Sequence, residues 1–186
     1  MADFQSFLPT LLRFEGGFVD DPIDPGGATN KGITLATFQK CARPMLGIEP
    51  SLANLKTLTD AQAGRIYKRL YWDVVRGDDI AMQELANIVF DFQVNAGANS
   101  ARLLQNVLNG QSGRPPIAVD GRIGDGTLAM LRACDGTKVY MAFKRGRLAY
   151  YDDLVRRRPA LVKFLKGWTN RVNAFPDLPR TAPTGA

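Results

Sequence analysis

Hydrophobic residues near the N-terminus recur at intervals of three and four positions. They are Phe4, Phe7, Leu8, Leu11 and Leu12. This spacing predicts the apolar face of a helix, and the pair Gly16-Gly17 marks its end. Pro9 lies within the pattern, so we expect the helix to kink there or to begin late.

Helical patterns dominate the rest of the chain. We expect helices at residues 34–46, 59–75, 79–96, 98–109, 125–134, 137–157 and 160–174. Thr59 and Gln62 form a capping-box pattern at the start of one of them, and Gly97 and Gly110 end two others. Residues 20–34, rich in Asp, Pro and Gly, predict turns that lead into a short β-hairpin. The expected fold class is therefore α+β and predominantly α-helical, with a small β-hairpin near the N-terminus.

Composition limits the chemistry that the chain can perform. The 186 residues are 45% hydrophobic and 23% charged, which is typical of a globular domain, and include no histidine. Catalytic triads and metal sites built on histidine are therefore excluded. Cys41 and Cys134 cannot form a zinc site alone, and we expect buried free thiols rather than a disulfide. Acid–base chemistry falls to carboxylates, lysine or tyrosine, and we expect neither a metal nor a cofactor.

The net charge of +6 is unevenly distributed. Residues 138–171 carry ten basic and two acidic side chains, so the remainder of the chain is slightly acidic. Such a segment suits a polyanion, for example an anionic membrane surface or a wall polymer, although a solvated helix face would have the same composition. Nucleic acid is not an expected partner, because no nucleic-acid-binding motif accompanies the basic residues.

Glu15 continues the apolar face of the first predicted helix. At about 100° per residue it lies about 20° from Phe4 around the helix axis, so its carboxyl group is partly shielded from water. Such shielding disfavours the charged form, which suits a general acid. Gly16 and Gly17 leave space in which a substrate can approach. A glutamate that turns out to solvent is the alternative that this geometry leaves open.

Asp24 is the second candidate group. It follows Glu15 by nine residues, in the loop that should fold back across the end of the helix. In glycoside hydrolysis one carboxyl group protonates the leaving oxygen, while a second carboxylate orients water or stabilises positive charge on the sugar ring. Thr29 and Asn30 lie further along the same loop and are candidates for holding that water. A turn-forming role before Pro25 is the alternative for Asp24.

Several blocks of the sequence together resemble a known enzyme family. The blocks are EGGFVDDPIDPGGATNKGIT (15–34), YWD (71–73), FDFQVNAG (90–97), ARLLQ (101–105), DGRIG (120–124), YY (150–151) and GW (167–168). Their order resembles glycoside hydrolase family 108, whose members are bacterial and phage lysozyme-like N-acetylmuramidases. The resemblance covers about residues 4–174.

The resemblance implies a lysozyme-like fold in two regions. We expect a catalytic region at residues 1–95 and a helical, peptidoglycan-binding-like region at residues 96–175 packed in the same globule. Residues 176–186, rich in proline, are expected to form a disordered tail.

The resemblance also implies the reaction, which is cleavage of the β-1,4 bond between N-acetylmuramic acid and N-acetylglucosamine. The catalytic acid would be Glu15, the glutamate of Glu-Gly-Gly. Phage-type lysozymes have eight residues between this glutamate and an aspartate, which Asp24 matches. They then have five residues before a threonine, whereas Thr29 follows Asp24 after only four and Asn30 occupies the expected position. The partner that holds the water is therefore left open between Thr29 and Asn30.

Other residues are candidates for contact with the sugar chain. Asp91 and Asn95 share a face of an otherwise apolar helix, and Gln93 lies between them in sequence. Buried polar side chains need hydrogen-bond partners, which either neighbouring protein groups or the substrate would provide. Tyr71 and Tyr151 are candidates for stacking on sugar rings, although single aromatic residues more often belong to a core. The candidate catalytic residues are thus Glu15, Asp24 and Thr29, and the candidate substrate-binding residues are Asn30, Tyr71, Asp91, Gln93, Asn95 and Tyr151.

The sequence therefore predicts a monomeric peptidoglycan hydrolase, either a phage endolysin or a secretion-associated muramidase, whose partner is the glycan strand. A non-hydrolytic wall-binding or secretion-associated module and a lytic transglycosylase on the same fold are the alternatives. The N-terminus lacks the basic and continuous apolar segments of a secretory signal. We expect synthesis in the bacterial or phage-infected cytoplasm and passage to the wall through a holin or a dedicated secretion route.

Overall fold

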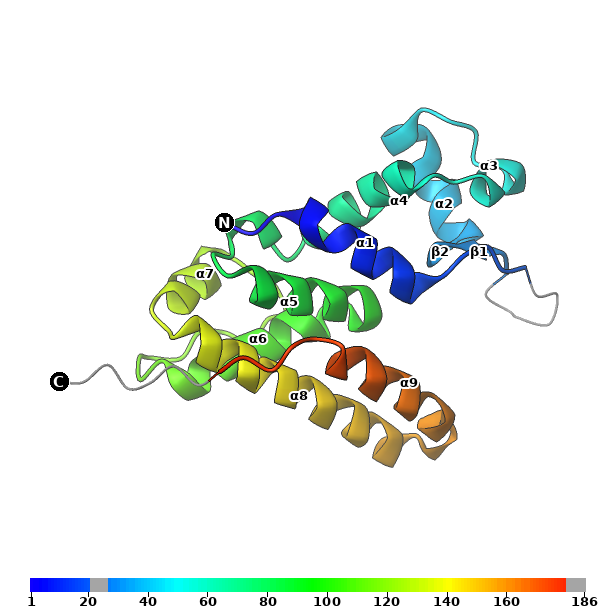
Figure 1. The fold of residues 1–186 in the computed structure, drawn as a ribbon. Helices are drawn as coiled ribbons and strands as arrows, with labels where there is room; N and C mark the ends of the chain where they lie inside the picture. Colours follow the sequence, from blue (N-terminus) through cyan, green and yellow to red (C-terminus); the bar gives the residue numbers. More distant parts are fainter. Residues whose placement is uncertain (21–26, 180–186) are drawn as a thin grey trace. The chain divides into compact units, whose positions relative to one another are not determined.

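The chain forms two compact units in the computed structural model, which describes residues 1–20 and 27–179. The N-terminal unit comprises Asp3–Asp73, and the C-terminal unit comprises Met1–Ala2 together with the chain from Val74 onward. Both units are mainly helical (Figure 1). Within the described ranges, every helix is too short or too polar to cross a membrane.

Helix α1 (Phe4–Glu15) begins at an aspartate cap. The Asp3 side chain accepts a hydrogen bond from the Gln5 amide (3.0 Å), which satisfies one of the amides that lack a partner at a helix start. The helix continues through Pro9, so the expected late start is wrong: Asp3 already fixes the first turn. The predicted apolar face is confirmed, with Leu12 half-buried and Phe4, Phe7, Leu8 and Leu11 buried.

The predicted β-hairpin is present, with β1 (Thr29–Asn30) antiparallel to β2 (Ile33–Thr34). Lys31 and Gly32 form its two-residue turn with φ angles of 50° and 73°, the left-handed backbone that a type I′ turn requires. The paired residues are Thr29 with Thr34 and Asn30 with Ile33. Val19 exchanges two backbone hydrogen bonds of 2.8 Å with the first residue of β1. The chain that leaves α1 therefore returns beside this strand.

Short helical segments complete the N-terminal unit. They are α2 (Leu35–Cys41) with a π-helical segment (Ala42–Leu46), α3 (Leu52–Lys56), and α4 (Asp60–Tyr67) with a second π-helical segment (Lys68–Trp72). Thr34 caps α2, and Thr59 and Gln62 form the predicted capping box of α4. The sequence did not predict α3, because five residues are too few to show a helical period.

The C-terminal unit is built mainly from four longer helices (Figure 1). They are α5 (Gln83–Ala96), α6 (Asn99–Gln111), α8 (Gly136–Arg157) and α9 (Val162–Asn173). Helix α8 packs against α5, α6 and α9, and the shorter α7 (Asp125–Arg132) packs against α6. Single 3-10 turns precede α5 and α9, at Gly77–Asp79 and Pro159–Leu161 respectively.

Several predicted helix boundaries move, among them one of α5 and one of α6. Helix α5 begins at Gln83 instead of residue 79, because the chain first makes the 3-10 turn and is extended at Ile80. Helix α6 continues through Gly110 instead of ending there, since the Ser112 amide still donates a hydrogen bond to the Leu108 carbonyl (3.0 Å).

A buried ion cluster joins α5, α8 and α9. Asp91 on α5 forms ion pairs with Arg147 on α8 (2.6 Å) and with Arg171 on α9 (2.7 Å). The side chains of Asp91 and Arg147 are fully buried. The rings of Phe92 and Tyr151 lie 5.1 and 5.8 Å from the Arg147 guanidinium carbon, so cation–π attraction adds to the ion pair. We call Asp91, Arg147 and Arg171 the Asp91 cluster.

The expected division at residue 95 stays a prediction. The two compact units meet in sequence at Asp73 and Val74, but compactness alone does not show which residues carry catalysis or binding. Of the expected tail, residues 180–186 lie outside the described residues.

Candidate active site

Glu15 is the last residue of α1 and is half-buried. Gly16 follows with a φ of 75°, and its amide donates to the Leu12 carbonyl (3.1 Å), which closes the helix. A Cβ atom added at Gly16 or Gly17 would have no atom within 4 Å. The two glycines therefore border open space, which no side chain of the described residues fills.

The Glu15 carboxyl group lies against the turn of the hairpin. A Cβ atom added at Gly32 would lie 2.9 Å from Cδ of Glu15, and closer still to its Oε2 atom and to the Tyr67 hydroxyl. The Tyr67 hydroxyl also donates a hydrogen bond to the carbonyl of Lys31 (2.8 Å). The end of α1, the hairpin turn and the end of α4 therefore meet at Glu15.

Tyr71 belongs to the same neighbourhood. Burial raises the pKa of its hydroxyl above the ordinary value, and the negative charge of Glu15 raises this pKa further. Its ring lies 5.6 Å from the ring of Tyr67. The sequence pointed to Tyr71 but not to Tyr67 or Gly32. The four-residue spacing of the two tyrosines was the available signal, because it places them on one helix face.

Thr29 and Asn30 lie on β1, on the side of the turn that precedes Lys31. Thr29 is half-buried, and its hydroxyl donates a long hydrogen bond to the Gly27 carbonyl (3.4 Å). Asn30 is buried, and its Nδ2 atom donates to the carbonyls of Leu55 (2.8 Å) and Lys56 (3.1 Å). The amide group of Asn30 thus fixes the end of α3 to the hairpin. Of the two candidates for holding water, Thr29 is the more available.

Asp24 lies outside the described residues, so its predicted role beside Glu15 stays a prediction.

A groove of about 500 Å³ runs beside the glycines that follow Glu15. Lys31 and Asp60 both line it and form an ion pair of 2.5 Å. Its lining residues are Leu8, Pro9, Leu12, Arg13, Gly16, Gly17, Lys31 and Asp60. All belong to the N-terminal unit, and the mixture of apolar stems and charged groups suits an amphipathic ligand such as a sugar chain.

Asp91, Gln93, Asn95 and Tyr151 belong to the C-terminal unit. Both oxygens of Asp91 are bound within the Asp91 cluster, and the Asn95 side chain donates to the Asp91 carbonyl (2.8 Å). Of the two roles that the sequence left open, structural support fits Asp91. Tyr151 is buried and stacks on Trp168 at 4.9 Å, which is a core position. Gln93 is half-buried.

The two cysteines are free thiols, as expected. Cys41 is buried and Cys134 is half-buried. Among residues 1–20 and 27–179, no three acidic, cysteine or histidine side chains gather in a way that could hold a metal ion.

Two family models match the chain in succession. The first is described as glycosyl hydrolase 108 and matches residues 8–97; the second is described as a predicted peptidoglycan domain and matches residues 99–173. Glu15, Gly32, Tyr67 and Tyr71 fall within the first match, and the Asp91 cluster spans both.

A solved structure of Brucella abortus SagA is similar to this chain over most of its length. The two sequences are 35% identical, the similarity covers 92% of this chain and 90% of the other, and the TM-score is 0.73. No curated protein matches the chain.

Proposed function

Because the chain belongs to the glycosyl hydrolase 108 family, we propose that it is an N-acetylmuramidase that hydrolyses the β-1,4 bond between N-acetylmuramic acid and N-acetylglucosamine. Family membership makes it a glycoside hydrolase, and the second family match makes peptidoglycan its substrate. Its helices and small antiparallel sheet agree with the predicted lysozyme-like fold. The observation that carries the proposed mechanism is the Glu15 carboxyl group, held between the hairpin turn and Tyr67 at the open end of α1.

In the proposed mechanism Glu15 is the general acid. It donates a proton to the glycosidic oxygen as the bond to the sugar breaks. Asp24 orients the attacking water or stabilises positive charge on the ring, and Thr29 holds the water. Gly32 and Tyr67 position the Glu15 carboxyl group and do not themselves react.

Replacing Glu15 by Gln tests the assignment. The amide has the same shape but cannot donate the acidic proton, so we expect hydrolysis to fall by about 10²–10⁴-fold. Reducing ends released from purified peptidoglycan measure the rate. Glu49→Gln is the matched control, because Glu49 is an exposed glutamate of the same unit that pairs with Arg43. Full activity of Glu15→Gln would refute the role of Glu15.

The products separate the proposal from its alternatives. Hydrolysis leaves reducing muramic acid ends, which mass spectrometry distinguishes from the anhydro ends of a lytic transglycosylase. Sedimentation with peptidoglycan without release of any ends would instead indicate a wall-binding or secretion-associated module.

We also propose that the chain acts as a monomer on the wall of bacteria, after export through a holin or a secretion route. An endolysin would lie beside a holin gene, so the gene neighbourhood tests the route. Sedimentation equilibrium at micromolar concentration tests the monomeric state.

A further inference from the structure

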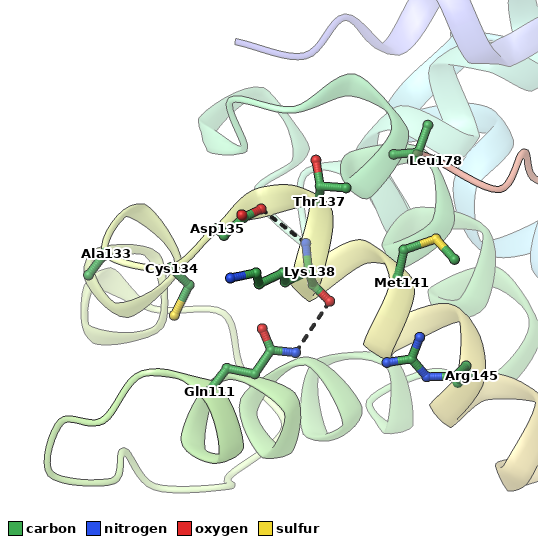
Figure 2. A pocket seen from close by; sticks show the side chains of 9 residues that line it. All are labelled: Gln111, Ala133, Cys134, Asp135, Thr137, Lys138, Met141, Arg145 and Leu178. Carbon is green, nitrogen blue, oxygen red and sulfur yellow. Dashed lines mark hydrogen bonds between the residues drawn. The ribbon is translucent and has the colours of Figure 1, made fainter. Parts of the chain in front are cut away.

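The C-terminal unit has a pocket of about 630 Å³ where the loop after α7 enters α8. Its walls are the end of α6, this loop, the first turns of α8 and one residue that follows α9 (Figure 2). The lining residues are Gln111, Ala133, Cys134, Asp135, Thr137, Lys138, Met141, Arg145 and Leu178. We call this the α8 pocket. It lies within the chain segment that the peptidoglycan family model matches, apart from Leu178.

Two cations on α8 line the pocket with an apolar side chain between them. Lys138, Met141 and Arg145 are spaced by three and four residues, so they share one face of the helix, as Figure 2 shows. The two cations are seven positions apart in sequence, which corresponds to about 10 Å along the helix axis. A ligand that reaches both must therefore be extended.

The charged groups of both cations are available to a ligand. Among the described residues, neither the Lys138 ammonium nor the Arg145 guanidinium has a hydrogen-bond or ion-pair partner. The neighbouring cations of α8 differ in this respect, because Lys144 is bound to Asp177 and Arg147 to Asp91. The Asp135 carboxylate accepts from the Lys138 backbone amide (3.1 Å) at the helix start.

The lining favours the peptide part of peptidoglycan over its sugars. None of the nine lining residues is aromatic, although flat rings are the usual platform for sugars. Stem peptides of the wall instead carry free carboxylates and alanine methyl groups. Lysine and arginine bind carboxylates through charge-assisted hydrogen bonds, and Met141, Ala133 and Leu178 offer apolar surface to methyl groups. Three extended residues span about 10 Å, which matches the spacing of the two cations.

We propose that the α8 pocket binds the stem peptide of peptidoglycan, with Lys138 and Arg145 each binding one of its carboxylates. This inference rests on the proposed function for the identity of the substrate, and it adds a second recognition element to it. The chain would then bind the wall both through its glycan and through its peptide.

Cys134 provides a direct measurement of occupancy, because it lines the pocket and is half-buried, while Cys41 is buried. The experiment follows iodoacetamide labelling of Cys134 in the full chain by peptide mass mapping. A synthetic tetrapeptide, L-Ala-γ-D-Glu-L-Lys-D-Ala, is the probe. We expect it to slow the labelling at least fivefold at saturation, and we expect the same peptide with amidated carboxyl groups to have no effect.

The double variant Lys138→Gln/Arg145→Gln should weaken the binding of the peptide, measured by calorimetry, at least tenfold. Lys163→Gln/Lys166→Gln is the matched control, because it removes two exposed cations of α9 that do not line the pocket, and its affinity should not change. Equal binding by both double variants would overturn the proposal. Protection of Cys134 by a chitin tetramer or by poly(glycerol phosphate), but not by the peptide, would overturn it in favour of a sugar or a phosphate polymer.

Failure of this inference is distinguishable from failure of the proposed function. The tetrapeptide has no glycosidic bond, so Glu15→Gln should bind it as the wild type does. Peptide binding without hydrolysis of peptidoglycan would refute the muramidase alone. Hydrolysis without peptide binding would refute the α8 pocket alone.

Discussion

Gly32 fits beside Glu15 because it has no side chain. A Cβ atom there would overlap the Glu15 carboxyl group and the Tyr67 hydroxyl, and the φ of 73° is one that side-chain-bearing residues rarely adopt. The backbone of the hairpin turn at Gly32 therefore lies directly against the carboxyl group of Glu15, the proposed acid, and helps to position it.

Gly32→Ala should lower both stability and activity. We expect a loss of about 1–3 kcal/mol in the free energy of unfolding, from backbone strain and overpacking. Hydrolysis should fall at least about tenfold, because the Glu15 carboxyl group must move. Urea denaturation and reducing-end release measure the two effects. Gly47→Ala is the control, since Gly47 has a similar positive φ (70°) but a Cβ atom there has nothing within 4 Å; equal effects of the two substitutions would contradict the contact.

The sequence could single out Glu15 as a candidate, but it could not predict the residues that surround it. The apolar stripe and the following glycines are local patterns, and both are present in the structure. The hydrogen bond from Tyr67 to Lys31 joins residues 36 positions apart, and no local period encodes such a contact. The same holds for Asn30, whose amide binds Leu55 across 25 positions.

At the scale of elements, the Asp91 cluster joins three helices. Asp91→Asn removes the charge that balances Arg147 and Arg171, and Arg147 stays fully buried. We expect a loss of about 3–5 kcal/mol in the free energy of unfolding, measured in urea. Asp153→Asn breaks exposed pairs on α8 and should cost less than about 1 kcal/mol. An unchanged unfolding curve with a raised KM would instead indicate that Asp91 contacts the substrate.

Helix α8 also holds the segment that follows α9. The Tyr140 hydroxyl donates to the Pro176 carbonyl (2.6 Å), and the Lys144 ammonium donates to the Phe175 carbonyl (2.7 Å). Burial, with smaller contributions from the charges of Asp177 and Glu84, raises the pKa of Tyr140 to about 12.

This raised pKa predicts a loss of stability at alkaline pH. Below pH 10 the folded and unfolded chains both keep the Tyr140 proton, so its stabilisation is complete. Between pH 10 and about 12 the unfolded chain loses the proton first, and stability falls by about 2 kcal/mol. Urea denaturation at pH 9 and pH 11.5 measures the decrease. Tyr140→Phe should be less stable at pH 9 but should lose less stability between the two pH values. Parallel losses would contradict the assignment to Tyr140.

At the scale of the whole molecule, the basic segment is less available than its composition suggests. Of the ten basic residues in 138–171, five are tied to carboxylates. They are Lys144, Arg147, Arg156, Arg157 and Arg171. The ion pairs of Lys144, Arg147 and Arg171 could not be read from the sequence, because their partners lie on other elements. Arg156 and Arg157 instead pair with Asp153 on their own helix, at a spacing that the sequence shows.

Binding to an anionic surface should therefore be modest and sensitive to salt. We expect the affinity for vesicles that contain 30% anionic lipid to fall about tenfold when the salt concentration rises from 0.05 to 0.2 M. Co-sedimentation measures the bound fraction, and uncharged vesicles provide the baseline. Binding that does not depend on salt would contradict an electrostatic contact.

The positions of most helices were predictable from local patterns. The connections and the side-chain contacts between helices were not. The capping box at Thr59 forms as predicted. The predicted hairpin also forms, and the positive φ angles of Lys31 and Gly32 place its turn at these two residues. The start of α5 was misplaced because the apolar residue Ile80 belongs to an extended connection and not to the helix. Arg171 binds Asp91 across 80 positions, and this pairing requires the folded unit.

The Asp91 cluster also restricts the paths along which this sequence can evolve. Loss of the aspartate alone would leave two arginines without their shared counter-charge, and loss of Arg147 alone would leave a buried carboxylate with one cation. An apolar replacement of the whole cluster can nevertheless be as stable as the ions themselves. Related sequences should therefore either keep all three residues or have exchanged all three, and intermediates that keep only one or two should be rare.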